Sequence, residues 1–276
     1  MLQEAAAVVI GSGALGSSVA FHLAKAGIAP VALIDKHEIA SQTSPRAAGL
    51  TSQLRQSELM TRLATMAVDK IKNFTAETGE EMIYFQSGSL KIARTPEHHQ
   101  QLQRDVERGQ KLGVDIDFVS PARARQLMPF FEPVGIRAVT YARNDLYLEP
   151  GQLPRGYAQA TAKLGGVLLP NTTVTGFGAE DGRITTVITD KGGIRASIVV
   201  DAAGAWTRLV ASLAGARVGA IATRHQLLIT DPIPGVEPHH PITRVIDCNV
   251  YIRPADGGLM LGFEDRCARL SRKTAN

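Results

Sequence analysis

The chain has 276 residues, which is long enough for a sizeable hydrophobic core and one or two domains. Hydrophobic residues make up 44% and charged residues 20%, and the net charge of +4 comes from scattered Lys and Arg, so no nucleic-acid-binding surface is indicated. No apolar stretch reaches the roughly eighteen residues of a membrane span, and no signal peptide is recognisable. The two cysteines, Cys248 and Cys267, show no metal-binding spacing, so we expect a cytoplasmic protein without a metal site.

The chain begins with the pattern of a strand, a glycine turn, a helix and a second strand. Its landmarks, in chain order, are the apolar residues 5–10, Gly11, Gly13, Gly16, the helical residues 19–24, Gly27, the apolar residues 31–34 and Asp35. A GxGxxG turn in this context, within about thirty residues, predicts a βαβ unit that binds a dinucleotide.

Each glycine of this turn has a physical task. Gly11 permits the tight turn, Gly13 lets a pyrophosphate approach the backbone, and Gly16 lets the helix pack close to the sheet. The helix N-terminus offers unpaired N–H groups and the positive end of its dipole to the phosphates. Asp35, about twenty residues after Gly16, is placed to accept the adenosine ribose hydroxyls. An acid there disfavours NADP but does not separate NAD from FAD.

Two further segments follow before the pattern changes. Residues 40–50 form a small, polar loop whose hydroxyls and amides suit a continuation of the phosphate site, although a surface loop has the same composition. Residues 57–78 predict one amphipathic helix, which Gly79 ends. Its apolar residues at helical spacing, which we interpret as facing the core, are Leu59, Leu63, Met66, Ile71 and Phe74.

The middle of the chain predicts an insertion of a different type. Strand-like alternation occurs in residues 88–93 and 114–118, and helices that begin with a Thr-Pro or Ser-Pro pair are expected at 95–112 and 120–127. Strands mixed with short helices indicate an α+β insertion rather than a continuation of a doubly wound sheet.

The α/β pattern returns after residue 144. A helix is expected at residues 153–164, followed by strands at 167–169, 172–177, 184–189 and 194–200. The last two strands are expected to form a hairpin around residues 190–193. The last strand runs into the small residues 201–206, a turn that allows close approach to a flat or charged ligand but also suits simple close packing. From residue 221 antiparallel strands are expected again, at 227–230, 249–253 and 259–263, with a hairpin turn at residues 256–258. Residues 267–276 carry no core pattern.

Three motifs together resemble a known family. The GxGxxG unit with Asp35, residues 43–49 and residues 199–206 are similar to the D-amino-acid oxidase-like FAD-dependent oxidoreductases. Residues 48–55, 85–93 and 225–230 resemble the sarcosine and dimethylglycine dehydrogenase branch, and the resemblance covers almost the whole chain. It implies a Rossmann-type FAD-binding domain at residues 1–84 and 145–220, interleaved with an antiparallel-sheet substrate domain at residues 85–144 and 221–276.

The resemblance also implies which residues meet the cofactor. Carried over by position, the residues at the pyrophosphate are Gly11, Gly13, Ala14, Leu15 and Gly16, and those at the adenosine are Asp35 and Lys36, with Val174 beside the adenine. The residues that approach the phosphates and flavin are Ser44, Arg46, Ala47, Ala48 and Gly49. A second turn that approaches the cofactor contains Ala203, Gly204 and Trp206.

The sequence departs from the family pattern in two places. Relatives with covalently bound flavin carry a His where this chain has Arg46, and because Arg cannot make that bond we expect FAD to be held non-covalently. The family chain also continues into a glycine-rich segment that completes the flavin site, and this segment is not found before Asn276. We expect either a fragment, a partner chain that supplies the segment, or compromised flavin binding.

The family reaction is oxidation of the C–N bond of an amine or amino acid, in which the flavin performs the redox chemistry and the protein positions the substrate. Arg55 and Arg253 are the candidates for binding a substrate carboxylate, because a guanidinium matches two oxygens. Tyr251 shares a strand face with Arg253 and matches a substrate-site tyrosine of relatives. Met260 stands where some oxidases of the family carry a lysine that assists oxygen, which favours a dehydrogenase.

Simpler interpretations remain for these residues and for the chain. Arg55 also suits an exposed charge before a helix, and Tyr251 a half-buried strand aromatic. The alternatives to a flavin amine dehydrogenase are an NAD-dependent dehydrogenase, in which residues 44–49 have no role, and a flavoprotein that is inactive or completed by a partner. The substrate, the electron acceptor and the oligomeric state are not determined by the sequence.

Overall fold

The computed structural model describes residues 2–263. Its first large sheet has six strands in the order β10-β11-β12-β1-β2-β9. Strand β1 pairs in parallel with both β2 and β12, and β2 pairs in parallel with β9, whereas β10, β11 and β12 form an antiparallel meander. The strands are β1 (Glu4–Ile10), β2 (Val31–Ile34), β9 (Val167–Leu169), β10 (Val174–Glu180), β11 (Arg183–Thr189) and β12 (Gly192–Asp201).

Both faces of this sheet are covered because its central strands are apolar on both sides. Ala7 and Val9 of β1 pack against the helices α1 (Ala14–Lys25) and α6 (Gln152–Lys163). Val8 and Ile10 face the opposite side, where α7 (Thr207–Leu213) packs. All four of these β1 side chains are at most 5% exposed, and burying such a valine or isoleucine contributes about 1.5–3 kcal/mol.

The second large sheet has seven strands in the order β13-β16-β15-β14-β5-β7-β6. All of its pairs are antiparallel except β14 with β5, which run parallel. Helix α4 (Pro96–Lys111) packs on one face and α5 (Pro121–Leu127) on the other. The strands are β5 (Ser89–Ala93), β6 (Ile116–Val119), β7 (Ala138–Ala142), β13 (Leu227–Ile229), β14 (Ile242–Val245), β15 (Val250–Ala255) and β16 (Gly258–Phe263).

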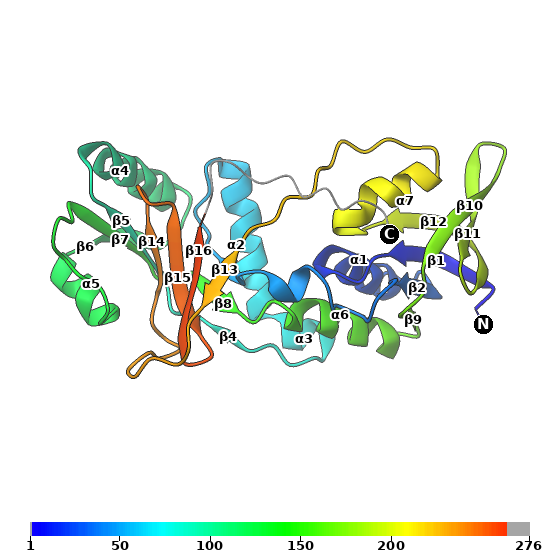
Figure 1. Cartoon of the computed structure of the whole chain (residues 1–276), viewed down its shortest axis with the longest axis horizontal. Coiled ribbons are helices and arrows are strands. Elements are labelled where there is room, and N and C mark those ends of the chain that lie inside the picture. The colour runs from blue at the N-terminus through cyan, green and yellow to red at the C-terminus, as the bar shows by residue number, and fades with distance from the viewer. Residues whose placement is uncertain (1, 264–276) are drawn as a thin grey trace.

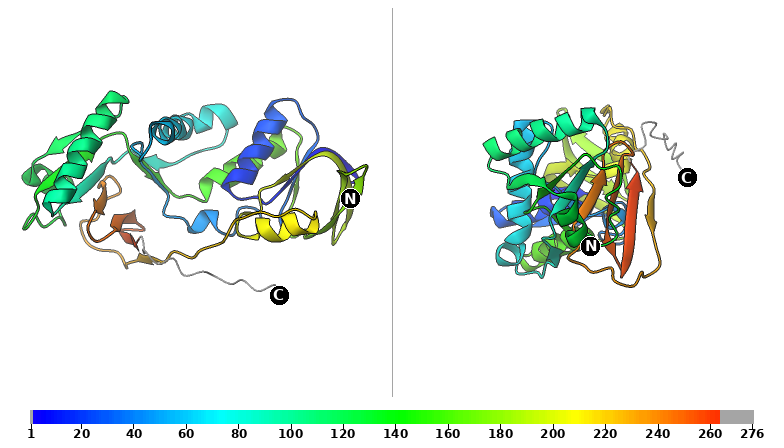
Figure 2. Two further views of the ribbon diagram at one scale, coloured as in Figure 1. Left: turned by 90° about the horizontal axis from the view of Figure 1, so that it is seen from above. Right: turned by 90° about the vertical axis from the view of Figure 1, so that its left-hand side faces the viewer.

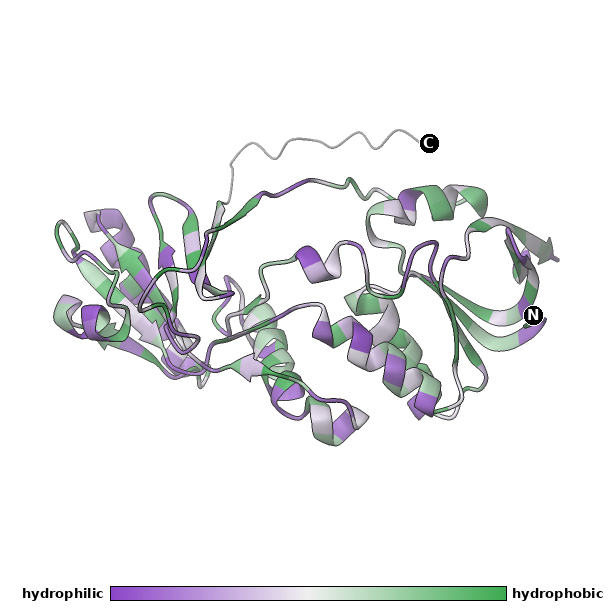
Figure 3. Ribbon diagram, turned by 60° about the horizontal axis from the view of Figure 1, so that its bottom comes forward, coloured by the Kyte–Doolittle hydropathy of each residue, from purple (hydrophilic) through white to green (hydrophobic). Residues whose placement is uncertain are grey.

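Smaller elements lie between the two large sheets, which occupy opposite ends of an elongated molecule (Figures 1 and 2). They are the three-stranded sheet β3 (Leu50–Thr51), β8 (Leu146–Leu148) and β4 (Tyr84–Phe85), and the helices α2 (Glu58–Lys72) and α3 (Phe74–Thr78). Single 3₁₀ turns are formed by η1 (Ser44–Arg46) and η2 (Gly204–Trp206). A long connection from α7 to β13 runs from one large sheet to the other (Figure 3).

The sequence predicted most of these elements, including the initial βαβ unit and both hairpins. The β11–β12 turn is made by Asp190 and Lys191. The β15–β16 turn is made by Asp256 and Gly257, and these two residues have positive φ. Strands β3, β4, β7, β8 and β14 and helix α7 were not predicted. Residues 267–276, for which no core pattern was found, lie outside the described residues.

The prediction of a single core-facing helix at residues 57–78 was wrong in two respects. The helix is interrupted at Asn73, where α2 ends and α3 begins. Ile71 and Phe74 are buried, but the rest of the expected stripe is exposed, with exposed fractions of 68% for Leu59, 49% for Leu63 and 63% for Met66. Helical periodicity correctly identified an amphipathic helix, but it does not show what the apolar face contacts.

The described residues contain neither a membrane-spanning helix nor a cluster of metal ligands. Within residues 2–263 no helix combines the length and apolar character needed to cross a bilayer. The same residues bring together no group of three or more His, Cys, Asp or Glu side chains that is arranged to hold a metal ion.

Candidate cofactor and substrate site

The N-terminus of α1 faces a loop rather than a capping side chain of its own. Gly13 occupies the N-cap position and supplies no side-chain hydrogen bond, and the first turn contains no acidic residue. Instead, the Ala14 N–H donates to Oγ of Ser44, at 2.9 Å, from the η1 turn. A helix start without negative charge, with a hydroxyl beside its first amides, suits an anionic ligand.

The three glycines of the turn differ in what a side chain would meet. A Cβ on Gly11 would lie 2.4 Å from the Ala202 carbonyl oxygen, and one on Gly16 would lie 1.8 Å from the Gly11 carbonyl oxygen. These two positions therefore exclude any side chain for reasons of packing. A Cβ on Gly13 would meet only Oγ of Ser44, at 3.1 Å, so this glycine leaves open the space in front of the helix.

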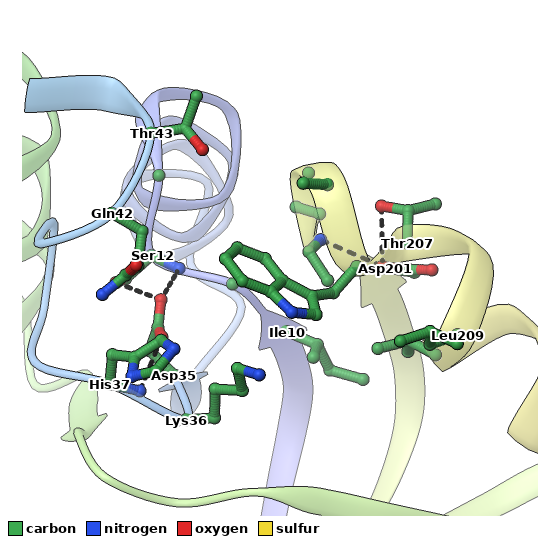
Figure 4. Close-up of a pocket in the computed structure, with 18 of the residues that line it drawn as sticks. Ile10, Ser12, Asp35, Lys36, His37, Gln42, Thr43, Asp201, Thr207 and Leu209 are labelled. Atoms are coloured by element: carbon green, nitrogen blue, oxygen red, sulfur yellow. Dashed lines mark hydrogen bonds between the residues drawn. The ribbon is translucent and has the colours of Figure 1, made fainter. Parts of the chain in front are cut away.

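Asp35 at the end of β2 is fixed by three hydrogen bonds (Figure 4). Its Oδ2 accepts from the backbone N–H of Ser12 at 2.8 Å and from its hydroxyl at 2.6 Å, while Oδ1 accepts from the His37 N–H at 2.9 Å. A carboxylate offers about four acceptor positions, so one remains for a ligand hydroxyl. Ser12 was missed by sequence reasoning, although it lies inside the GxGxxG turn.

A cavity of about 780 Å³ lies in front of these groups, within the size range of cofactor sites. The apolar side chains of Leu209 and Leu213 on α7, together with Ile221, form part of its wall. The residues predicted to bind the cofactor that line this cavity are Gly11, Gly13, Ala14, Leu15, Asp35, Lys36, Ser44, Val174, Ala203, Gly204 and Trp206.

Trp206 lies beside the end of β2. The Lys36 Nζ lies 4.6 Å from the centroid of the Trp206 ring, a cation–π distance, and the imidazole of His37 is 5.9 Å from it. The tertiary fold thus joins the residues after β2 to the residues after β12, which are far apart in the sequence.

Asp201, at the end of β12, is a second lining residue that was not predicted. Its Oδ1 accepts from the Ala203 N–H at 3.0 Å and from the Thr207 hydroxyl at 3.3 Å, and so shapes the η2 turn. Its Oδ2 is buried and has no hydrogen-bond partner among the described residues. Its position at the carboxyl end of a parallel strand next to β1 is the signal that would have identified it.

Five predicted cofactor residues lie outside the cavity lining. Gly16 packs within the turn, and Arg46, Ala47, Ala48 and Gly49 continue from η1 towards the small sheet. The Arg46 guanidinium donates to the carbonyl oxygens of Ser41, at 2.7 Å, and Gln42. The Arg46 side chain therefore stabilises the loop to which it belongs.

The predicted substrate residues lie on other elements. Tyr251, half-buried on β15, stands opposite Arg244 of β14 and Gly262 of β16, and the Arg244 guanidinium is 5.7 Å from its ring centroid. A Cβ on Gly262 would come within 2.0 Å of the Tyr251 ring, so this glycine makes room for the tyrosine. Arg244 was not predicted, because strand β14 was not.

The two predicted arginines differ in exposure. Arg55 is exposed in the segment before α2, and its backbone N–H donates to Thr61 Oγ1 at 3.1 Å. Arg253 is fully buried on β15, two residues after Tyr251, and its guanidinium is hydrogen-bonded within the protein. Met260 is paired with Arg253 across β15 and β16 and is also buried.

A buried carboxylate, Asp145, supports the segment that leads to Arg55. Its Oδ1 accepts from the Gln53 N–H at 2.8 Å, and its Oδ2 accepts from the Ser89 hydroxyl. Burial raises the pKa of Asp145 above its usual range, because the charged form loses hydration, and these hydrogen bonds oppose the shift. Asp145 therefore links β5 to the Arg55 segment.

The βαβ unit, the glycine turn and the cavity together define a dinucleotide-binding α/β protein. The family model described as FAD dependent oxidoreductase, DAO, matches residues 6–275, and the chain belongs to this family. FAD is accordingly its cofactor, and the residues around the α1 N-terminus fit the adenosine and pyrophosphate parts of that molecule.

Individual relatives are similar over nearly all of this chain. Dimethylglycine dehydrogenase of rat mitochondria is 29% identical over 262 residues, which are 94% of this chain and 31% of the relative, and human mitochondrial sarcosine dehydrogenase is 30% identical over 263 residues, 92% and 28%. Sarcosine oxidase subunit beta of Arthrobacter sp is 26% identical over 267 residues, 92% and 64%. The chain thus spans about a third of the length of the dehydrogenases.

Solved structures confirm the fold class. L-proline dehydrogenase from P. horikoshii is 28% identical with a TM-score of 0.85, covering 95% of this chain and 70% of that protein. The glycine oxidase of Bacillus cereus aligns with a TM-score of 0.82 at 24% identity, covering 99% of this chain and 74% of that protein, and supports the fold alone.

Proposed function

We propose that this chain carries the FAD-binding and substrate-binding parts of an oxidoreductase that oxidises the C–N bond of a secondary or tertiary amino acid such as sarcosine or dimethylglycine. The observation that carries the proposal is the match of residues 6–275 to the FAD-dependent oxidoreductase family, together with a cavity at the N-terminus of α1. The names of the similar dehydrogenases support the substrate class.

The cofactor, when bound, supplies the hydride acceptor. We propose that residues 1–84 and 145–220 bind it and that residues 85–144 and 221–276 form the substrate domain. The α1 N-terminus and Ser44 hold the pyrophosphate, Asp35 accepts the ribose hydroxyls, and residues 46–49 approach the flavin. Because Arg46 cannot form the covalent flavin bond that a histidine makes, we propose that FAD is held non-covalently.

For the substrate, we propose that Tyr251 orients the amine on the seven-stranded sheet and that Arg55 binds the carboxylate. A guanidinium suits this task because its N–H groups match both carboxylate oxygens. Met260 in place of a lysine supports a dehydrogenase that passes electrons to a separate acceptor. The cytoplasmic location stays a prediction.

The test uses the purified protein with FAD, under anaerobic conditions. We expect flavin absorption bands, and bleaching of these bands when sarcosine or dimethylglycine is added. Dimethylamine, which lacks the carboxylate, is the matched control and should bleach the flavin far more slowly. A protein that binds FAD but is bleached by no N-alkyl amino acid contradicts the proposal.

One alternative is supported by a specific observation. The chain resembles sarcosine oxidase subunit beta, whose name identifies it as one subunit of a larger enzyme. A flavoprotein completed by a partner chain would bind FAD, but it would be bleached by substrate only after the partner is added. Protein that binds no FAD even with its partner would contradict both versions.

The non-covalent state of the cofactor is a separate prediction. Because position 46 carries Arg, we expect acid precipitation to release all of the FAD into the supernatant. Mass spectrometry of the denatured protein should give the mass of the polypeptide alone. A mass increase equal to one flavin would contradict the prediction.

A further inference from the structure

Arg253 is a fully buried arginine that is bonded entirely within the protein. Its exposed fraction is 0%. Nε donates to the carbonyl oxygen of Ala48 at 2.7 Å, Nη1 to that of Pro254 at 2.6 Å, and Nη2 to Oε1 of Glu149 at 3.1 Å. The three nitrogens thus contact two distant segments, those of Ala48 and Glu149, and the backbone of the strand to which Arg253 belongs.

The burial of this charge is compensated locally. Glu149 forms an ion pair with it, and the guanidinium carbon lies 4.9 Å from the ring centroid of Tyr147. An unpaired buried charge is strongly unfavourable, so a guanidinium at this depth requires such partners. Glu149 and Tyr147 belong to β8 and the residue that follows it, which lie between the two large sheets.

The carbonyl held by Arg253 belongs to the segment proposed to approach the flavin. The next carbonyl oxygen, that of Gly49, accepts from the Leu148 N–H at 3.1 Å. Gly49 has a φ of 69°, and a Cβ there would lie 2.0 Å from the Leu148 carbonyl oxygen. Two successive carbonyls are therefore fixed, one by the seven-stranded sheet and one by the small sheet.

The same contacts disagree with a role for Arg253 as the substrate carboxylate ligand. A bidentate carboxylate would need two parallel N–H groups, and the Nε and Nη2 edge is already directed at Ala48 and Glu149.

We propose that Arg253 is a positioning residue that holds the Ala48 carbonyl, and with it residues 46–49, in place against the bound cofactor. This inference rests on the proposed function, since it requires that residues 46–49 approach the flavin. It assigns to one side chain of the seven-stranded sheet the task of setting the distance between that sheet and the cofactor loop.

The experiment measures FAD binding to the apoprotein and the visible circular dichroism of the bound flavin. Arg253→Met keeps an unbranched side chain in place of the aliphatic part of the arginine but removes its charge and its N–H groups. We expect FAD affinity to fall about tenfold or more, the equivalent of one charge-assisted hydrogen bond, with an altered visible spectrum. Arg253→Lys, which keeps the charge and fewer N–H groups, should fall between Arg253→Met and the parent protein.

A matched control is Arg195→Met on β12. Arg195 makes an exposed ion pair with Glu4 at the start of β1, whereas the cavity lies at the other end of that strand. The FAD affinity and spectrum of Arg195→Met should therefore equal those of the parent. Thermal unfolding of each apoprotein shows whether a variant is folded. If Arg253→Met does not fold, the FAD affinity and visible spectrum of Arg253→Lys are compared with those of the parent instead.

The overturning result is an Arg253 variant whose FAD affinity and spectrum are unchanged but which binds carboxylate-bearing substrates much more weakly than the parent. That pattern would make Arg253 the carboxylate ligand. If the parent binds FAD but no amino acid bleaches it, the proposed function fails, whereas the comparison of FAD binding among the variants still decides the role of Arg253.

Discussion

Gly16 and Gly13 belong to one turn, but the space around them differs. A methyl group on Gly16 would be placed 1.8 Å from a backbone oxygen, which cannot move without breaking the turn. A methyl group on Gly13 would approach only the Ser44 hydroxyl, at 3.1 Å, and this side chain can rotate. One glycine is thus required by the fold, whereas the other leaves open the space in front of α1 where we propose that the pyrophosphate lies.

We therefore predict opposite outcomes for two substitutions. Gly16→Ala should destabilise the protein by more than about 3 kcal/mol, as expected for a severe backbone clash. Gly13→Ala should change stability by less than about 1 kcal/mol, but should weaken FAD binding about tenfold, because the methyl group occupies the pyrophosphate position. Urea unfolding and FAD titration measure the two effects. Equal loss of stability in both variants would contradict this assignment.

Helix α2 carries an apolar face that is exposed in this chain. Leu59, Leu63 and Met66 keep helical spacing, but of the expected stripe only Ile71 and the following Phe74 reach the core formed with α1 and α6, which Val68 of α2 also joins. The interruption at Asn73 turns α3 so that Phe74 packs against Tyr157, with ring centroids 4.8 Å apart. The apolar side chains whose burial stabilises this region therefore lie towards its C-terminal end.

This difference predicts how two substitutions will compare. Phe74→Ala removes a side chain with 0% exposure and should cost about 3–5 kcal/mol of unfolding free energy. Leu63→Gln, in an exposed position, should stay within about 0.5 kcal/mol of the parent. Chemical denaturation of both variants is the measurement. A loss of several kcal/mol for Leu63→Gln would show that a core contact covers this face.

An ionic cluster also joins the helices α1, α2 and α3. Glu77 accepts hydrogen bonds from Lys70, at 2.9 and 3.0 Å, and from Lys25 at 2.9 Å. The hydrogen bond from Lys70 is the largest cause that lowers the pKa of Glu77 to about 2, burial opposes the shift, and Lys25 adds to it. The pKa of the folded state is thus below that of the unfolded chain.

The sign of the pH dependence follows from this shift. The stabilisation by ionised Glu77 is fully present above its ordinary pKa of about 4.5 and is lost as the pH falls towards about 2. Glu77→Gln should therefore destabilise the protein by about 1 kcal/mol at pH 7 and converge with the parent near pH 2. Thermal unfolding between pH 2 and pH 7 tests this. Parallel curves at all pH values would contradict it.

On the scale of the whole molecule, Tyr147 connects three regions. Its hydroxyl donates to the Pro238 carbonyl oxygen in the connection before β14, its ring stacks on Phe85 at 5.0 Å, and Arg253 lies over the same ring. Burial is the main cause that raises the pKa of Tyr147 to about 12, Arg253 opposes the rise, and Glu149 adds to it. The neutral phenol is therefore the form that the folded protein stabilises.

This predicts a loss of stability in alkaline solution. The contribution of Tyr147 is fully present below its unfolded pKa of about 10 and is lost as the pH rises towards about 12. Tyr147→Phe removes this titration and one hydrogen bond, so it should be about 1 kcal/mol less stable at pH 8 but lose less stability from pH 10 to pH 12. Unfolding curves of the two proteins over this range are compared. An identical alkaline decline in both would contradict the prediction.

The sequence predicted the cofactor half of the molecule best because its signals are local. Gly11, Gly16 and Asp35 lie within one βαβ unit, whose turn leaves no space for other residues. Strand β14 was missed because it is short and its partner in parallel pairing, β5, lies far away along the chain. Arg244, the cross-strand neighbour of Tyr251, was missed with it.

The sequence by itself determined the βαβ unit, the residues around the α1 N-terminus, both hairpins and the family. The βαβ unit and the hairpins follow from periodicity and turn chemistry, which act between residues close together in the chain. The family and most of the cofactor residues follow from the resemblance of three motifs. Only the tertiary structure decided that the face of α2 is exposed, that Asp201 shapes the η2 turn, and that Arg253 is bonded to Ala48 and Glu149. The reason is that burial and hydrogen-bond partners depend on contacts between segments distant in sequence, which no local pattern encodes.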